Sequence, residues 1–190
     1  VDIAATDIEN MVKFAKDNAI DLVMVAPDDP LVLGMVDAME KEGIRAFGPR
    51  ANAAIIEGSK AFSKELMKKY NIPTANYEVF TDSTSAIGYI KAQNTFPTVI
   101  KADGLALGKG VIIAQNLEEA EQAVHEMIDD GKFGKSGSRG VIEEFLTGPE
   151  VSVLAFTDGK TVKPMVSAQD HKRAYDNDEG LNTGGMGTFS

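Results

Sequence analysis

The sequence predicts an α/β protein built from more than one unit. Its first 50 residues alternate between short apolar strands and amphipathic helices, an order typical of parallel strands joined by right-handed crossovers. A strand, a glycine-rich loop and a second strand follow at residues 98–113. Near the carboxyl end an Asp-Gly pair, a strong hairpin signal, separates two more strands. We therefore expect the end of a doubly wound sheet followed by a region of α+β character.

The first unit begins with a helix. Thr6 and Glu9 have the spacing of a capping box, and apolar residues from Ile8 to Ala15 recur at helical intervals. Gly43 is placed to end a second helix in the left-handed conformation. The remaining elements are, in order, a strand at 21–26, a turn at 27–30, the second helix over 32–39 and a strand at 44–47. Because the order opens on a helix and residue 1 is valine, we expect this chain to be a piece of a longer protein.

A second unit is predicted after a helical segment at 51–70 that breaks near Gly58 and ends before Pro73. Its β-branched runs and polar caps predict alternating strands and helices. These elements are a strand at 77–80, a helix at 83–92, strands at 98–101 and 111–113, a helix from residue 116, a mobile polar loop at 129–139, a strand at 140–146, and a hairpin formed by 150–156 and 161–167.

Composition excludes several classes of function. The 190 residues are 43% hydrophobic and 25% charged, which predicts a packed globular core. A net charge of −10 would repel nucleic acid and anionic membranes, so we expect neither as a partner. There is no cysteine, hence no disulfide and no thiolate metal site. No apolar run reaches membrane-spanning length, and we expect a cytoplasmic protein.

The loop after the strand at 98–101 has the composition of a phosphate cradle. Glycines let backbone N–H groups approach an anion, and Lys101 and Lys109 add positive charge. The spacing from Gly104 to Gly108 is too short for a Walker A loop, and Gly110 stands where that loop needs Ser or Thr. An ordinary glycine-rich hairpin remains the alternative interpretation.

Several charged side chains are candidates for ligand binding. Lys101 ends an apolar strand and needs an anion unless it reaches solvent. Lys60 is, taken alone, an ordinary surface lysine. Glu143 and Glu144 are adjacent on a strand, so they face opposite sides and cannot act as a catalytic pair. The one that faces the core side needs a donor, such as an adenine amino group or a ribose hydroxyl.

Two further polar segments lie near the carboxyl end. Asp170-His171-Lys172-Arg173 follows an apolar strand and is suited to anion recognition, whereas Asn182–Gly187 is a second glycine cluster that permits close backbone approach. His125 has no metal-ligand spacing to the other histidine, and zinc and Ser-His-Asp patterns are absent from the sequence.

These motifs, in this order, resemble the glycinamide ribonucleotide synthetase family of the ATP-grasp superfamily. The resemblance covers essentially the whole chain, and the Asp-His-Lys-Arg and Asn-Thr-Gly-Gly-Met-Gly elements are its most specific parts. The matching segments are Phe47-Gly48-Pro49, Ile55–Lys60, Val99–Ala106, Gly108–Val111, Val141–Leu146, Gln169–Arg173 and Asn182–Gly187.

The resemblance implies an ATP-dependent ligation of glycine to 5-phosphoribosylamine through glycyl phosphate. It also implies magnesium or manganese, with ligands expected outside this chain, and it supplies no catalytic side chain or metal ligand here. The implied nucleotide-binding residues are Lys60, Lys101, Gly104, Leu105, Ala106, Gly108, Lys109, Gly110, Glu143, Glu144, Phe145, Leu146 and Glu150. The implied residues for glycine and phosphoribosylamine are Asp170, His171, Lys172, Arg173, Asn182, Thr183 and Gly184.

The implied organisation has three parts. Residues 1–76 form the end of an amino-terminal α/β domain, 77–148 a small lid subdomain, and 149–190 the start of the second ATP-grasp subdomain. Two departures from the family pattern concern substrate geometry: aspartates follow Pro27 where a Glu is usual, and Leu181 replaces a proline. The alternatives are another ATP-grasp carboxylate–amine ligase or, for the isolated chain, an ATP-binding module without turnover.

Overall fold

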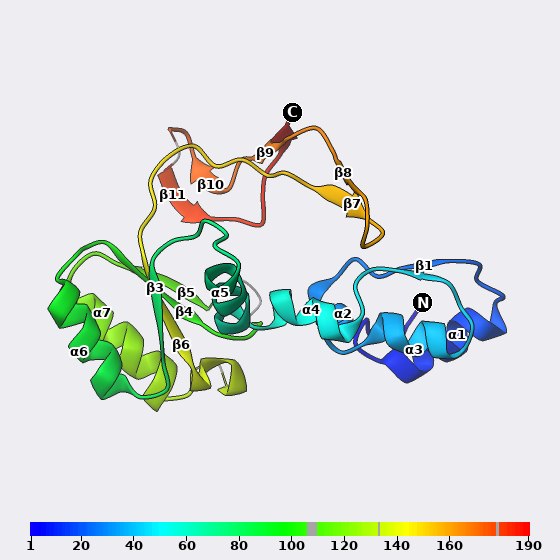
Figure 1. The fold of residues 1–190 in the computed structure, drawn as a ribbon, viewed down its shortest axis with the longest axis horizontal. Coiled ribbons are helices and arrows are strands. Elements are labelled where there is room, and N and C mark those ends of the chain that lie inside the picture. The colour runs from blue at the N-terminus through cyan, green and yellow to red at the C-terminus, as the bar shows by residue number, and fades with distance from the viewer. Residues whose placement is uncertain (106–109, 133, 178) are drawn as a thin grey trace. The chain divides into compact units, whose positions relative to one another are not determined.

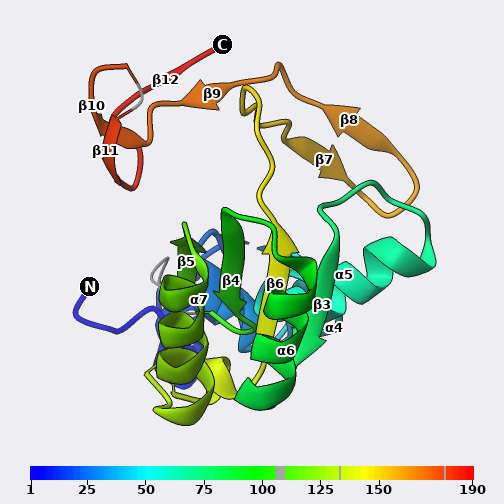
Figure 2. The same ribbon diagram turned by 90° about the vertical axis from the view of Figure 1, so that its left-hand side faces the viewer.

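The computed structural model describes residues 1–105, 110–132, 134–177 and 179–190. The chain divides into two compact units, Val1–Phe145 and Leu146–Ser190. Figures 1 and 2 show helices and strands mixed throughout the first unit and short strands in the second. The predicted α/β class is confirmed.

The amino-terminal part of the first unit is a parallel strand pair packed with helices. Val23 pairs with Ala46 and Met24 with Phe47, as the alternation of strands and helices predicts. Its small core is formed by Ala15, Val25, Met35, Val36 and Met39. The elements are α1 (Ile8–Asp17), β1 (Val23–Met24), α2 (Asp28–Val32), α3 (Met35–Lys41) and β2 (Ala46–Phe47).

Two predictions for this region were wrong. The cap of α1 is Asp7, whose carboxylate accepts from the Asn10 amide at 3.2 Å, so the capping box from Thr6 does not form. Residues 28–32 form the short helix α2 in place of the predicted turn. Pro30 fits there because it lies in the first turn of the helix, where its missing N–H leaves no hydrogen bond unmade.

Two consecutive helices connect this part to the large sheet. Helix α4 (Ala51–Gly58) and helix α5 (Lys60–Lys69) are separated by Ser59, which confirms the predicted break. The extended backbone of Ser59 starts α5, and its hydroxyl accepts from the Phe62 amide at 3.1 Å. This turn places Lys60 and Lys64 on the helix that begins beside the glycine loop.

The large sheet is antiparallel, with strand order β3-β6-β4-β5. It consists of β3 (Tyr77–Phe80), β4 (Thr98–Ala102), β5 (Val111–Ala114) and β6 (Gly140–Glu144). Residues 98–114 therefore form the predicted hairpin around the glycine loop. The segment predicted as a polar loop contains a short 3₁₀ helix, η2 (Gly134–Ser138).

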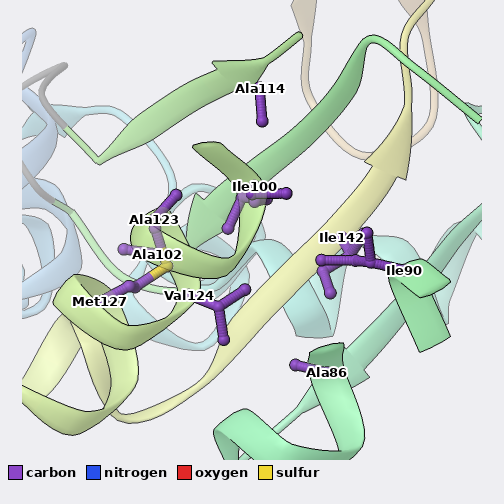
Figure 3. Close-up of a cluster of buried hydrophobic side chains, with 10 residues drawn as sticks. Ala86, Ile90, Ile100, Ala102, Ala114, Ala123, Val124, Met127 and Ile142 are labelled. Carbon is purple, nitrogen blue, oxygen red and sulfur yellow. The ribbon is translucent and has the colours of Figure 1, made fainter. Parts of the chain in front are cut away.

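Helices cover one face of this sheet and close the larger core. They are α6 (Ser83–Gln93), α7 (Leu117–Val124) and the π-helical turn η1 (His125–Asp129). In Figure 3, Ile100 and Ile142 of the sheet lie among Ile90, Val124 and Met127 of the helices. Since side chains alternate along a strand, the residues between these core positions face the opposite side of the sheet. Lys101 and Glu143 are on that side.

The second unit consists of short antiparallel strands. They are β7 (Ala155–Thr157), β8 (Val162–Pro164), β9 (Gln169–Asp170), β10 (Arg173–Tyr175), β11 (Glu179–Asn182) and β12 (Thr188–Phe189). The pairs are β7 with β8, β9 with β12 and β10 with β11. Within the part of this unit that the structure describes, no residue is fully buried.

Among the described residues, no helix has the length and apolar character that crossing a bilayer requires.

Candidate functional site

Lys101 meets an anion of the protein itself. Its ammonium nitrogen lies 2.9 Å from Oε2 of Glu143, on the neighbouring strand β6. The desolvation expected for this lysine is thus offset by an internal carboxylate. Within the described part of the chain, Glu143 is the one acceptor found for Lys101, so its other ammonium hydrogens can serve a ligand.

Glu143 is the buried member of the adjacent glutamate pair, with 5% of its surface exposed. A second lysine, Lys64 of α5, lies 3.2 Å from the same Oε2 atom. The other oxygen, Oε1, is buried without a hydrogen-bond partner among the described residues. A buried carboxylate oxygen in this condition is an acceptor available to a donor from outside the chain.

Glu144 faces the opposite side, as the strand alternation predicts, and is exposed. Its two oxygens accept from the backbone N–H and the side-chain amide of Asn76, at 3.0 and 2.8 Å. This clamp joins the end of β6 to the residue before β3. Glu144 therefore has a structural partner, whereas the predicted role in nucleotide binding stays a prediction.

Lys60 lies beside the first glycine of the loop. Its ammonium donates to the carbonyl of Gly104 at 3.0 Å, and its backbone N–H donates to the carbonyl of Asp103 at 2.9 Å. Partial burial lowers the pKa of Lys60 below its ordinary value, against the attraction of Asp103. Among the described residues, the Gly104 carbonyl is the one hydrogen-bond acceptor found for this partly desolvated ammonium, so Lys60 has capacity for an anionic ligand.

Asp103 is a site residue for which the sequence analysis predicted no role. Its carboxylate accepts from the Ser59 hydroxyl at 2.9 Å, the Ala61 amide at 2.7 Å and Nε of Arg139 at 2.9 Å. The carboxylate thereby joins the start of α5, the end of β4 and the residue before β6. A charged residue directly after a buried strand needs such donors, and this was the available signal.

The glycine loop is only partly described. Gly104 and Leu105 precede it, and Gly110 follows it. The Gly110 carbonyl accepts a hydrogen bond from the Ala102 amide at 2.8 Å. The predicted residues Ala106, Gly108 and Lys109 lie outside the described residues. After β6, the side chains of Phe145, the last residue of the first unit, and of Leu146, the first residue of the second, are exposed.

In the second unit the two most specific motifs lie side by side. Strand β9 pairs with β12, the His171 amide donates to the Gly187 carbonyl, and the Met186 amide donates to the His171 carbonyl. The Thr183 amide donates to the Lys172 carbonyl at 2.6 Å. These bonds bring together Asp-His-Lys-Arg and the glycine cluster, which are separated by eight residues in the sequence.

Two hollows open on these segments. Asp170, His171 and Arg173 line one of about 500 Å³, and Glu150 and Lys172 line another of about 270 Å³ that also reaches Asp170 and Arg173. Both hollows mix charges of either sign, as recognition of a zwitterion or a phosphorylated amine requires.

Individual side chains in this unit already have partners. Lys172 lies 3.3 Å from Glu150 in an exposed ion pair. The Arg173 guanidinium donates to the Gly180 carbonyl at 2.6 Å. The Thr183 hydroxyl accepts from the Gly185 amide. Gly184 has open space around it, and the side chain of Asn182 lies outside the description.

The described residues contain no group of three or more histidine, aspartate or glutamate side chains that could hold a metal ion.

Two lysines beside the start of a glycine-rich segment and a buried glutamate with an unpartnered oxygen form a candidate site for a nucleotide. Residues 58–190 match the family model for the ATP-grasp (A) domain of phosphoribosylglycinamide synthetase, and residues 1–57 match the model for its N domain. The chain belongs to the phosphoribosylglycinamide synthetase family.

Individual relatives agree with this assignment. The chain is 54% identical over all 190 residues to a phosphoribosylamine–glycine ligase of Haemophilus influenzae, of which it covers 44%. It is also similar to the crystal structure of a phosphoribosylamine–glycine ligase from Thermotoga maritima, with 41% identity and a TM-score of 0.71. That match covers 76% of this chain and 37% of the other.

More distant proteins share the fold alone. A biotin carboxylase from Campylobacter jejuni aligns with a TM-score of 0.75 at 16% identity, over 88% of this chain and 39% of that one. The chain spans less than half the length of the curated relatives it matches.

Proposed function

We propose that the complete protein carrying this sequence ligates glycine to 5-phosphoribosylamine, using ATP and giving glycinamide ribonucleotide, ADP and phosphate. The supporting observation is the pairing of β9 with β12, which brings the two family-specific segments together around hollows of mixed charge. The names of the relatives at 54% identity agree with this assignment. The division into parts at residues 76 and 148 is proposed with it.

In this proposal the first unit binds ATP. Lys60 and Lys101 contact phosphate oxygens, and the loop from Gly104 to Gly110 lies over them. Glu143 accepts from the adenine amino group through its free oxygen, and the exposed side chain of Phe145 contacts the base. The structure supports this arrangement through the unpartnered Oε1 atom and the partly desolvated Lys60.

The second unit is proposed to hold the two other substrates. Asp170 is an acceptor for an amine, whereas Lys172 and Arg173 are donors for carboxylate or phosphate oxygens. Glycine's carboxylate then attacks the terminal phosphorus of ATP, ADP leaves, and the amine of phosphoribosylamine displaces phosphate from glycyl phosphate. The chain contributes position and charge, and no described residue is assigned as a general base.

The test is ADP release by the complete protein with glycine and phosphoribosylamine each supplied and each withheld. Release that requires both substrates supports the ligase, and Lys101→Ala should then abolish it. If ATP binds but neither substrate stimulates release, the protein is a different ATP-grasp ligase or a nucleotide-binding module.

A further inference from the structure

Lys64 is a buried lysine to which neither the sequence motifs nor the proposed function assigns a role. Lys64 is only 9% exposed and lies on α5, one turn after Lys60. Its ammonium donates to the Thr74 hydroxyl at 2.7 Å and to the Ala75 carbonyl at 3.4 Å, and it forms an ion pair with Oε2 of Glu143 at 3.2 Å. It also lies 5.5 Å from the centre of the Tyr77 ring. Two hydrogen bonds and the ion pair thus hold the buried Lys64 ammonium among groups of the protein itself.

Lys101 differs from Lys64 although both contact the same carboxylate oxygen. Its side chain is 27% exposed, compared with 11% for Lys64, and Glu143 is its one acceptor in the described residues. Lys64 is therefore the fixed partner of Glu143, and Lys101 is the partner that can turn toward a ligand. Both lysines engage Oε2, which leaves Oε1 as the free acceptor.

We propose that Lys64 is a positioning residue that sets nucleotide base specificity. By holding Oε2 from the side of α5, Lys64 fixes the rotation of the Glu143 carboxylate so that Oε1 is presented as an acceptor. It also supplies the positive charge that Glu143 needs when Lys101 contacts phosphate. This inference rests on the proposed nucleotide site.

A carboxylate oxygen in a fixed position selects an amino group over a carbonyl. Adenine presents an exocyclic amine, which donates to Oε1, whereas hypoxanthine presents a carbonyl oxygen, which that atom repels. Hydrogen bonds to charged groups are worth about 1.5–3 kcal/mol, so ADP should bind about 10- to 100-fold more tightly than IDP. If the carboxylate rotates freely, this ratio falls.

The experiment is calorimetric titration of the complete protein with ADP and with IDP, comparing Lys64→Met with the unaltered protein. We expect the ratio of the two affinities to fall at least about fivefold in Lys64→Met, mainly through weaker ADP binding. Lys68→Met, which removes an exposed lysine of the same helix, is the matched control and should keep the ratio. A purely structural role for Lys64 predicts equal losses for both nucleotides and an unchanged ratio, which would overturn the inference.

A second variant covers failure of Lys64→Met to fold. Thr74→Val removes one acceptor of the Lys64 ammonium at an exposed position and leaves every charge in place. It should shift the ratio in the same direction by a smaller factor, and an unchanged ratio in a folded Thr74→Val protein contradicts the proposal. The proposed ligase fails separately, if the unaltered protein prefers ADP over IDP but releases no ADP with glycine and phosphoribosylamine.

Discussion

Arg139 forms an ion pair with Asp103, 36 residues earlier in the sequence, and both its Nε and its Nη2 donate to Oδ2. Asp103 directly follows β4 and Arg139 directly precedes β6. This ion pair therefore joins the end of β4 to the start of β6, at the point where the glycine loop begins. The backbone repeats the link, because the Asp103 amide donates to the Arg139 carbonyl at 3.0 Å. The base of the loop is thus held from both sides, and Lys60 is attached to it through the Asp103 carbonyl.

Replacing this carboxylate should destabilise the protein. Asp103→Asn removes the charge that Arg139 faces and weakens the acceptor of the Ser59 hydroxyl and the Ala61 amide. We expect a loss of about 2–3 kcal/mol in the free energy of unfolding by urea, because Asp103 is buried while Arg139 is partly exposed. Asp130→Asn, at an exposed position, should change it by less than about 0.5 kcal/mol.

Hydrogen exchange provides a local readout of the same change. The Ala61 amide should exchange faster in Asp103→Asn, since its acceptor is a carboxylate oxygen of Asp103. An unchanged exchange rate at Ala61 together with unchanged stability would show that the carboxylate is not the anchor inferred for it.

Replacing either of two helical glycines by alanine should change the free energy of unfolding, but in opposite directions. A Cβ at Gly58 would lie 2.9 Å from Cγ1 of Val32, a stiff branched side chain, whereas a Cβ at Gly88 meets nothing within 4 Å. Gly58→Ala should cost about 1–2 kcal/mol through overpacking between α4 and α2. Gly88→Ala should gain about 0.5–1 kcal/mol, because alanine loses less backbone entropy in a helix. Urea unfolding of both variants checks this, and equal signs would contradict the packing described.

Local sequence signals predicted most elements of the large sheet but not the partners within the site. The strand at Tyr77–Phe80 is rich in aromatic and β-branched residues, and the hairpin follows from two β-branched runs with glycines between them. The contact of Lys101 with Glu143 depends on the register of β4 against β6, which no pattern within either strand specifies. The predicted turn at residues 27–30 was wrong because proline suits both a turn and the first turn of a helix.

A close contact between Gly185 and Asp170 predicts a glycine-specific effect on the second unit. Gly185 has φ +101°, and a Cβ there would lie 3.3 Å from Oδ2 of Asp170. Gly185→Ala should therefore strain the loop by about 1–3 kcal/mol and displace the Asp170 carboxylate. Under the proposed function, kcat/KM for glycine should fall about tenfold or more, as measured by ADP release against glycine concentration. Gly187→Ala, with open space at the Cβ position, is the control; an equal loss there would indicate general sensitivity of the loop.

The pKa of Lys60 should lie below that of an ordinary lysine and should rise when a nucleotide binds. Burial disfavours its charged form and lowers its pKa below the usual 10.5. At neutral pH the charged Lys60 therefore lowers the free energy of unfolding, and this is a cost in stability. That cost disappears as the pH rises through the folded pKa, and this contribution to stability therefore increases with pH in the alkaline range below 10.5. Phosphate oxygens at Lys60 favour the charged form, so saturating ADP should raise this pKa.

The measurement is NMR titration of the protein after reductive ¹³C-methylation of its lysines, with the Lys60 signal assigned by its absence in Lys60→Met. The same variant should bind ADP about tenfold or more weakly, because a charge-assisted hydrogen bond to phosphate is lost. A Lys60 midpoint at or above 10.5 without nucleotide would contradict the desolvation inferred from the structure. A depressed midpoint that ADP leaves unmoved would instead place the phosphates away from Lys60, and the glycine loop would then need a different ligand.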